Sequence, residues 1–274
     1  MTSTIVEIAI QITVSKRGKL SLRIKRFIFV FVCTLYSVLC TPLFAQKAQN
    51  KPYIDDRLFH FGFQLGINFS TFGITDSELP DTINPGNYVY HARVSGLLPG
   101  FNVAFVSDLR LSKHLNLRFC PGLQFSSRTI SYTRMDENGN ASRDWKSRTG
   151  KGNSVDVLAI PVYLPLYLKW SADREGNYRP YVIAGGGASF NVSRDREKPV
   201  LMNLIDYFAE VGFGCDLYFQ WFKFCPEISY RIGFANQLCP YSERHDNLSP
   251  YEAFYSNSIL RMTSHCVCLT FNFE

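Results

Sequence analysis

The chain of 274 residues lacks a hydrophobic run long enough to cross a bilayer as a helix. Its apolar run at residues 27–39 has only 13 residues, whereas a membrane helix needs about 20. Six Lys and Arg residues precede the run and a short segment ending in Ala45 follows it, which is the pattern of a secretory signal. We therefore predict an N-terminal extension and signal peptide over residues 1–45, cleaved between Ala45 and Gln46. A lipoprotein reading at Cys40 is an alternative, but Leu39 is not the small residue that such processing requires.

Excess charge is also missing once the signal is removed. The formal net charge of +6 falls to +1, because residues 1–45 contain six basic residues and one acidic residue. The remaining chain is too close to neutral to indicate a nucleic-acid partner, so we predict none.

Motifs for metals, cofactors and phosphates are absent or incomplete. Six of the eight cysteines follow residue 45, but only Cys266 and Cys268 are close in sequence, and one such pair is weak support for zinc. Residues 149–152 resemble a phosphate-binding loop without its full glycine spacing or its strand-to-helix context. We predict no metal, no cofactor and no catalytic residue. A disulfide in an oxidising compartment is compatible with the lumen-facing positions expected for Cys225, Cys266 and Cys268, but the sequence does not predict one.

What the chain does contain is long alternation with a period of two residues. In the hairpin at residues 206–234, apolar side chains such as Val211 and Phe213 alternate with polar or small ones such as Glu210 and Gly212. These strands are long enough to cross a bilayer. If the apolar face contacts lipid, the charged side chains point into a narrow lumen, where they can pair. The alternative is a large soluble sandwich with a buried aromatic face.

The same alternation recurs along the chain and gives eight strands. Long connections alternate with short turns, as in bacterial outer-membrane barrels, and a closed sheet leaves no edge in lipid. We predict an all-β fold, an eight-stranded antiparallel transmembrane β-barrel over residues 58–274, preceded by a periplasmic lead-in at 46–57. The predicted location is the cell outer membrane, with its lipid bilayer as a partner. The predicted strands cover residues 59–69, 101–111, 114–133, 158–169, 179–191, 206–219, 222–234 and 259–274.

A barrel of eight strands has an interior that side chains fill, so we predict no open pore. We expect irregular pairing at Pro161 and Pro165, because proline cannot donate a ladder hydrogen bond. Tyr218, Trp170 and Trp221 are expected in the aromatic girdles at the membrane surfaces. The predicted lumen charge network, with a structural role, consists of His60, Asp108, Arg110, Arg118, Arg128, Lys169, Glu210, Asp216, Lys223, Glu227 and Arg231.

Four runs of the sequence resemble the PorT family, small outer-membrane barrel proteins associated with the type IX secretion system of Bacteroidetes. The runs lie at residues 59–74, 98–132, 178–191 and 206–238, and the resemblance extends over nearly all of the chain after the signal. Cys120 and Cys225 depart from the family pattern, which favours small hydroxyl residues there. The loops that begin at Met135 and Ala235 match poorly.

The resemblance implies a role in exporting proteins with C-terminal sorting domains, such as proteases and adhesins, together with other secretion components. Because a filled barrel cannot pass folded cargo, we expect an accessory or assembly role. Two alternatives come from other classes: a generic small barrel for envelope integrity or adhesion, and an outer-membrane enzyme. Catalysis would need convergent groups at an accessible rim, whereas the candidate acids and His60 are spread through the predicted lumen, so we predict that the protein is not an enzyme.

Overall fold

The computed structural model describes residues 49–82, 87–96, 98–143, 145–146, 152–193, 198–244 and 249–274. The predicted signal peptide and its cleavage between Ala45 and Gln46 lie outside these residues. Within these ranges, no helix is long and apolar enough to cross a membrane.

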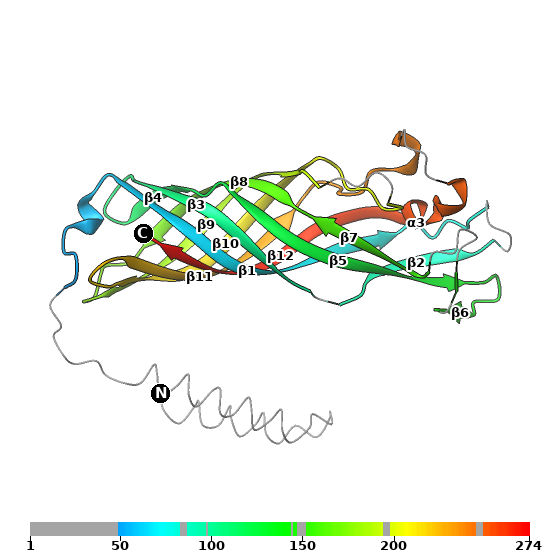
Figure 1. The fold of residues 1–274 in the computed structure, drawn as a ribbon, viewed down its shortest axis with the longest axis horizontal. Helices are drawn as coiled ribbons and strands as arrows, with labels where there is room; N and C mark the ends of the chain where they lie inside the picture. The colour runs from blue at the N-terminus through cyan, green and yellow to red at the C-terminus, as the bar shows by residue number, and fades with distance from the viewer. Residues whose placement is uncertain are drawn as a thin grey trace, which may run out of the picture. The chain divides into compact units, whose positions relative to one another are not determined.

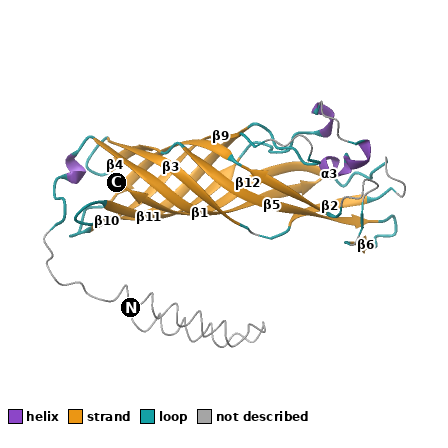
Figure 2. Ribbon diagram, viewed as in Figure 1, coloured by secondary structure: helices purple, strands orange, loops and turns teal. Residues whose placement is uncertain are grey.

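In the described part of the chain, twelve strands form one antiparallel sheet that curls into a barrel (Figure 1). The helices among the described residues are single short turns at the two ends of the barrel (Figure 2). The strands are β1 (Phe59–Asp76), β2 (Val89–Val94), β3 (Pro99–Arg110), β4 (Leu115–Phe119), β5 (Gly122–Met135), β6 (Ala141–Ser142), β7 (Ser154–Ala159), β8 (Pro161–Ser171), β9 (Tyr178–Asn191), β10 (Ile205–Tyr218), β11 (Lys223–Gly233) and β12 (Ile259–Phe273). The helical turns are η1 (Ile54–Asp56), η2 (Tyr241–Glu243), η3 (Pro250–Glu252) and α3 (Phe254–Asn257).

The sheet closes on itself through β1. This strand pairs with β12 on one side, from Phe63 opposite Phe273, and with β3 on the other, from Phe59 opposite Leu109. From β12 the order continues through β11, β10, β9 and β8 to β4, β5 and β3. The all-β outer-membrane barrel fold is therefore confirmed. The predicted count of eight strands differs from the twelve observed, because the third and fourth predicted strands are each divided in two and β2 and β6 lie in segments predicted as loops.

Prolines mark both divisions. The chain leaves the ladder at Cys120 and Pro121 between β4 and β5, and at Ile160 just before Pro161. The irregularity expected at Pro161 is thus present. Pro165 lies inside a continuous β8, but on one side it faces the break between β4 and β5, where the registered pairs stop at Leu166 and resume at Tyr163, so the irregular pairing expected there is also present.

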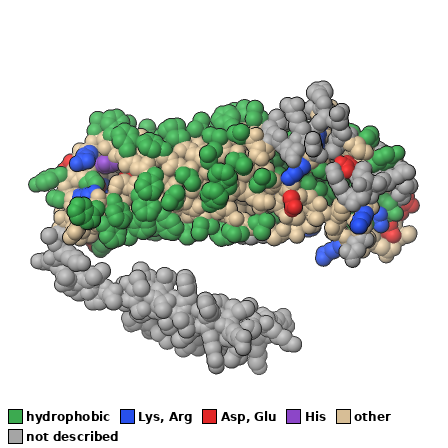
Figure 3. Space-filling model, in the orientation of Figure 1, with side chains coloured by type: hydrophobic (Ala, Val, Ile, Leu, Met, Phe, Trp, Pro, Cys, Tyr) green, Lys and Arg blue, Asp and Glu red, His purple; other side chains and the backbone are tan. Residues whose placement is uncertain are grey.

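The outer wall of the closed ring is apolar. Outward side chains on all sides of the ring remain exposed although they are large and hydrophobic, and Figure 3 shows hydrophobic side chains covering this face between charged groups at the two ends. Such a surface is stable against lipid rather than water. It includes Phe61, Phe63, Leu65, Phe101, Phe105, Leu164, Leu166, Leu168, Val211, Phe213, Ile228, Val267 and Leu269.

Several strands continue beyond this band. β1 has 18 residues, whereas about 9–11 suffice for a tilted strand to cross a bilayer. We call the protruding part the extension; it comprises β2, β6, β7, α3, the ends of β1, β5 and β12 that lie beside them, and the described residues of the connections around these elements. In the extension the polarity of the two faces is reversed: the outward positions carry Thr71, Thr75, Ser127, Thr129, Ser131 and Thr133.

The interior of the extension is a hydrophobic core like that of a soluble protein. Tyr90 and Phe254 stack with ring centroids 4.3 Å apart, and Trp145 packs against both. The strands therefore change from lipid-facing to water-facing along their own length, because the apolar side chains move from the outside to the inside. The core contains Phe72, Tyr90, Ala92, Ile130, Tyr132, Trp145, Val155, Val157, Ala159, Val200, Met202, Leu238, Phe254, Tyr255, Ile259 and Met262.

Candidate functional site

The lumen within the membrane holds one continuous cluster of charges near the end at which β12 finishes. Arg118 lies at its centre, 3.0 Å from Asp108, 3.4 Å from Glu227 and 2.9 Å from Glu274. The Arg118 side chain is 2 % exposed, so the three carboxylates compensate its loss of hydration. Strand alternation produces this convergence, because Arg118, Asp108 and Glu227 all occupy inward positions.

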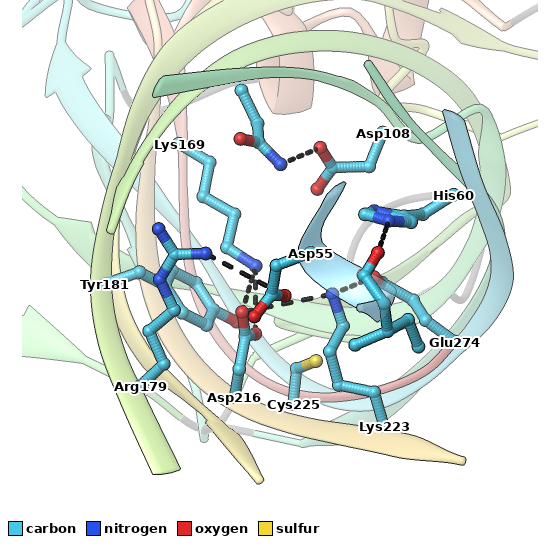
Figure 4. Close-up of polar contacts among 12 residues, drawn as sticks. Asp55, His60, Asp108, Lys169, Arg179, Tyr181, Asp216, Lys223, Cys225 and Glu274 are labelled. Carbon is cyan, nitrogen blue, oxygen red and sulfur yellow. Dashed lines mark hydrogen bonds and ion pairs between the residues drawn. The ribbon is translucent and has the colours of Figure 1, made fainter. Parts of the chain in front are cut away.

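Two lysines extend the cluster. Lys169 lies 2.8 Å from Asp216, and Lys223 contacts both Asp216, at 3.9 Å, and Glu274. Figure 4 shows Lys169, Lys223 and Asp216 pointing toward one another inside the ring of strands. Tyr181 donates a hydrogen bond to Glu227 at 2.9 Å. Four carboxylates and three cations thus form a network in which each charge has an opposite partner.

A second, smaller group lies nearer the extension. Arg231 donates to Glu210 at 2.8 Å and to Gln124 at 2.9 Å. Tyr167 and Ser229 donate to the same Glu210 carboxylate, at 2.7 and 2.5 Å. This carboxylate therefore accepts three hydrogen bonds and is fully compensated inside the barrel.

Arg128 stands at the boundary between the polar lumen and the apolar core of the extension. Its guanidinium lies 4.1 Å above the ring of Phe72, an arrangement that stabilises a cation electrostatically. Among the described residues, no carboxylate forms an ion pair with Arg128, and its Nε has no hydrogen-bond partner. Arg128 borders a cavity of about 30 Å³ shared with Gln124 and Asp206, which is enough for about one water molecule.

The mouth at the end where β12 finishes is covered by the chain itself. In the segment that includes η1, Asp55 accepts a hydrogen bond from Tyr218 at 2.8 Å and lies 3.6 Å from Arg174 and 3.8 Å from Arg179. Asp56 pairs with Arg110 at 3.0 Å. The lead-in predicted for residues 46–57 therefore contacts the barrel over its described part.

Two sequence expectations change at this mouth. Tyr218 was expected in an aromatic girdle, but it is buried and points inward, because it shares the inward phase of Asp216 on β10. Arg110 has the inward phase of β3 but lies at the rim, with 27 % of its side chain exposed. Trp170 and Trp221 are exposed, as expected for girdle residues.

The opposite end of the lumen is closed by the aromatic core of the extension. Tyr132 donates to the carbonyl of Tyr255 at 2.9 Å, and Tyr255 donates to the carbonyl of Gly152 at 2.6 Å. These bonds join β5, α3 and the segment before β7. Burial raises the pKa values of Tyr90 and Tyr132 well above the usual value near 10, since a phenolate would lose its hydration there.

The structure brings most of the predicted lumen charges together. His60 is buried, with its Nε2 2.8 Å from the carbonyl of Ile54. Sequence reasoning missed Glu274, Asp206 and Asp55. Glu274 directly follows the last strand, and continuing the inward phase of Asn272 by two residues would have found it. The predicted residues that form ion pairs within the lumen are Asp108, Arg118, Lys169, Glu210, Asp216, Lys223, Glu227 and Arg231.

The arrangement of these side chains is that of a closed lumen. The charges of the two lumen clusters neutralise one another, side chains fill the space between them, and both ends are covered by the chain. In the described part of the chain, no group of three or more His, Cys, Asp or Glu side chains is arranged to hold a metal ion. These features define a small, closed, membrane-spanning β-barrel.

Comparison with known proteins agrees with this class. The chain matches the outer membrane protein beta-barrel domain family over residues 44–238, which is more than half of its length, and it belongs to that family. It is therefore an outer-membrane protein embedded in the bilayer. A crystal structure of Neisserial surface protein A is similar, with a TM-score of 0.37 and 8 % sequence identity, covering 78 % of this chain and 97 % of that chain. No curated protein matches the sequence.

Proposed function

We propose that this protein has an accessory or assembly role in type IX protein secretion, supporting the export of sorting-domain cargo such as proteases and adhesins. The proposal rests on the resemblance of residues 59–74, 98–132, 178–191 and 206–238 to the PorT family. Its partners are other type IX secretion components in the same membrane.

The filled lumen supports an accessory role over the role of a conduit for cargo. An extended polypeptide with its side chains needs a channel about 10 Å wide. The cavity beside Arg128 has a volume of only about 30 Å³, which is room for about one water molecule. Passage would require the ion pairs around Arg118 to separate inside the membrane, at a cost of several kcal/mol for each charge left alone. The protein therefore acts through its surfaces, and cargo passes elsewhere.

The direct test is deletion of the gene in its own host, followed by measurement of sorting-domain cargo in the culture medium and in the periplasm. We expect cargo to accumulate inside the cell and to return to the medium when the wild-type gene is restored. A matched complementation with Arg110→Gln, a rim residue whose pair is partly exposed, should restore secretion fully. Normal secretion by the deletion strain would remove the proposal.

A second candidate function is adhesion or envelope integrity. The observation that favours it is the extension, which has its own hydrophobic core and raises a polar surface beyond the membrane. A deletion strain that secretes cargo normally but loses surface attachment or detergent resistance would support this candidate. We infer no enzymatic role, because the lumen carboxylates are buried and paired instead of converging at an accessible rim.

A further inference from the structure

The chain that precedes β1 lies across the mouth as a strap, which we define as residues 50–57. Side chains and backbone of this strap are bound by the barrel. Arg174 donates to the carbonyl oxygens of Asn50 and Lys51, and the amide of Asn50 donates to the side-chain oxygen of Asn177 at 2.8 Å. The mouth therefore binds both carbonyl and amide groups of a peptide backbone.

One carboxylate of the strap enters the mouth. The two oxygens of Asp55 lie 2.8 and 3.0 Å from the hydroxyl of Tyr218, which donates to them, and Figure 4 shows Arg179 directed toward the same carboxylate. The side chains of Arg174 and Arg179 are only 10 % exposed. In the described part of the chain, no other carboxylate forms an ion pair with either guanidinium. Two cations at the mouth thus share one anion, which the strap supplies.

The strap fits this mouth loosely. Asp55 lies 3.6 Å from Arg174 and 3.8 Å from Arg179, whereas a charge-assisted hydrogen bond between such groups has a length of about 2.7–2.9 Å. No residue of η1 is buried, and Tyr53 is 78 % exposed, so the strap gains little stability from the hydrophobic effect. Partly exposed ion pairs also contribute little. A peptide that binds the same groups with better geometry can therefore displace the strap.

The short tether of the strap explains why it covers the mouth although its contacts are weak. Only Arg57 and Leu58 separate η1 from β1, so the strap is held at the mouth at an effective concentration on the order of millimolar. Weak contacts suffice at that concentration, but they yield to a ligand of higher affinity. The arrangement is that of a binding site occupied by a segment of its own chain.

We propose that the mouth is a binding site for an acidic peptide segment of a second protein, and that the strap is its displaceable ligand in cis. The partner places a carboxylate where Asp55 lies and carbonyl oxygens where Arg174 donates. A phosphate group matches the guanidinium groups, but it has no N–H to donate to the side-chain oxygen of Asn177, so a peptide is favoured. The inference goes beyond the proposed role in secretion and does not depend on it.

Peptide binding to the full mature chain tests the proposal. The probe is a synthetic peptide with the sequence of residues 46–57, which is titrated to millimolar concentration into the fluorescently labelled barrel in detergent micelles, with binding measured by thermophoresis. Asp55→Asn in the protein weakens the strap, so we expect this variant to bind the probe at least about tenfold more tightly than the wild type does. No saturable binding by the folded Asp55→Asn variant would overturn the proposal.

Matched peptides show whether the carboxylate is recognised. A probe carrying Asp55→Asn should bind the same protein at least about tenfold more weakly, because it loses a hydrogen bond between charged or polar groups and the anion that two guanidinium groups share. A probe carrying Asp56→Asn is the control, since that side chain is 66 % exposed, and it should bind as tightly as the unaltered probe. Equal affinities for the two altered probes would refute recognition of a carboxylate.

A change in the barrel locates the site. Adding Arg174→Gln to the Asp55→Asn protein should abolish binding, whereas adding Arg261→Gln, at the opposite end of β12, should leave it unchanged. Binding that survives Arg174→Gln would place the site elsewhere. Displacement of the probe by inorganic phosphate at matched ionic strength would identify a simple anion site and overturn the peptide assignment. The peptide comparison uses one folded protein, so it gives a result even if Arg174→Gln fails to fold, and no readout depends on secretion.

Discussion

Removing the central cation of the lumen should destabilise the barrel more than any other change of a single charge in that cluster. Arg118→Met keeps most of the side-chain volume but leaves Asp108, Glu227 and Glu274 without their shared partner. Four buried carboxylates would then face only Lys169 and Lys223. Breaking a buried pair by removing one partner costs about 3–5 kcal/mol, a large share of the 5–15 kcal/mol that typically stabilises a protein.

The assay is urea unfolding of the barrel in lipid vesicles, with the folded fraction measured by its faster migration on unheated gels. Arg110→Met is the matched control, because its pair with Asp56 is partly exposed and such pairs contribute about 0–1 kcal/mol. We expect a large loss of unfolding free energy for Arg118→Met and a small one for Arg110→Met. Equal unfolding curves for Arg118→Met and the wild type would refute the idea that these charges depend on one another.

Three further predictions concern the outer wall and the extension. Leu166→Arg, on the lipid-facing wall, should lower the unfolding free energy by about 2–4 kcal/mol near the midplane. Ser131→Arg, on the outward face of the extension, should change it by less than about 0.5 kcal/mol. Urea unfolding in vesicles compares the two variants, and equal costs would contradict the reversal of polarity. Phe254→Ala should cost about 3–5 kcal/mol by opening a cavity in the aromatic core, detected as faster hydrogen exchange in the extension but not in the membrane part; uniform exchange throughout would count against a separate core. The raised pKa values of Tyr90 and Tyr132 mean that the folded state binds the phenolic protons more tightly than the unfolded state does. The contribution of this binding to the free energy of unfolding is therefore complete below the unfolded pKa of about 10 and declines as pH rises above it. Tyrosinate absorbance should therefore appear later in folded than in denatured protein, and coincident titrations would be inconsistent with their burial.

The membrane-spanning strands could be predicted because alternation is a local property. Phe61, Phe63 and Leu65 repeat every second residue next to Gly62 and Gln64, and only a two-faced strand accounts for that pattern. Alternating long and short connections then gave the barrel topology.

The extension could not be predicted from the same rule. The apolar side chains pass from the outward phase at Ile67 to the inward phase at Phe72, so the alternation is interrupted and resembles the end of a strand. Only the positions of β2 and α3 around this segment show that it continues into a core. Similarly, Pro121 interrupts pairing with β3 and β8 at the break between β4 and β5, and the length of such a break depends on neighbouring strands that are distant in sequence.

The candidate site was predictable in composition but not in pairing. Inward phase placed Arg118, Asp108 and Glu227 in the lumen, but the shear of the barrel decides which of them meet. The contribution of Asp55 depends on how the chain folds back over the mouth, and no periodicity predicts this. Tyr218 could have been placed correctly by its phase, which equals that of Asp216, but its aromatic ring near a turn suggested a girdle.

The most direct test of the central claim is depth-dependent quenching of single tryptophans by lipids brominated in the middle of their acyl chains. One variant retains Trp145 alone, with Trp170→Phe and Trp221→Phe, and a second combines Leu166→Trp with replacement of all three native tryptophans by Phe. The account predicts strong quenching of the indole introduced at position 166 and none of Trp145, which lies in the enclosed core of the extension. Equal quenching of both, or quenching of neither, would contradict a lipid-facing wall that ends below a water-exposed extension.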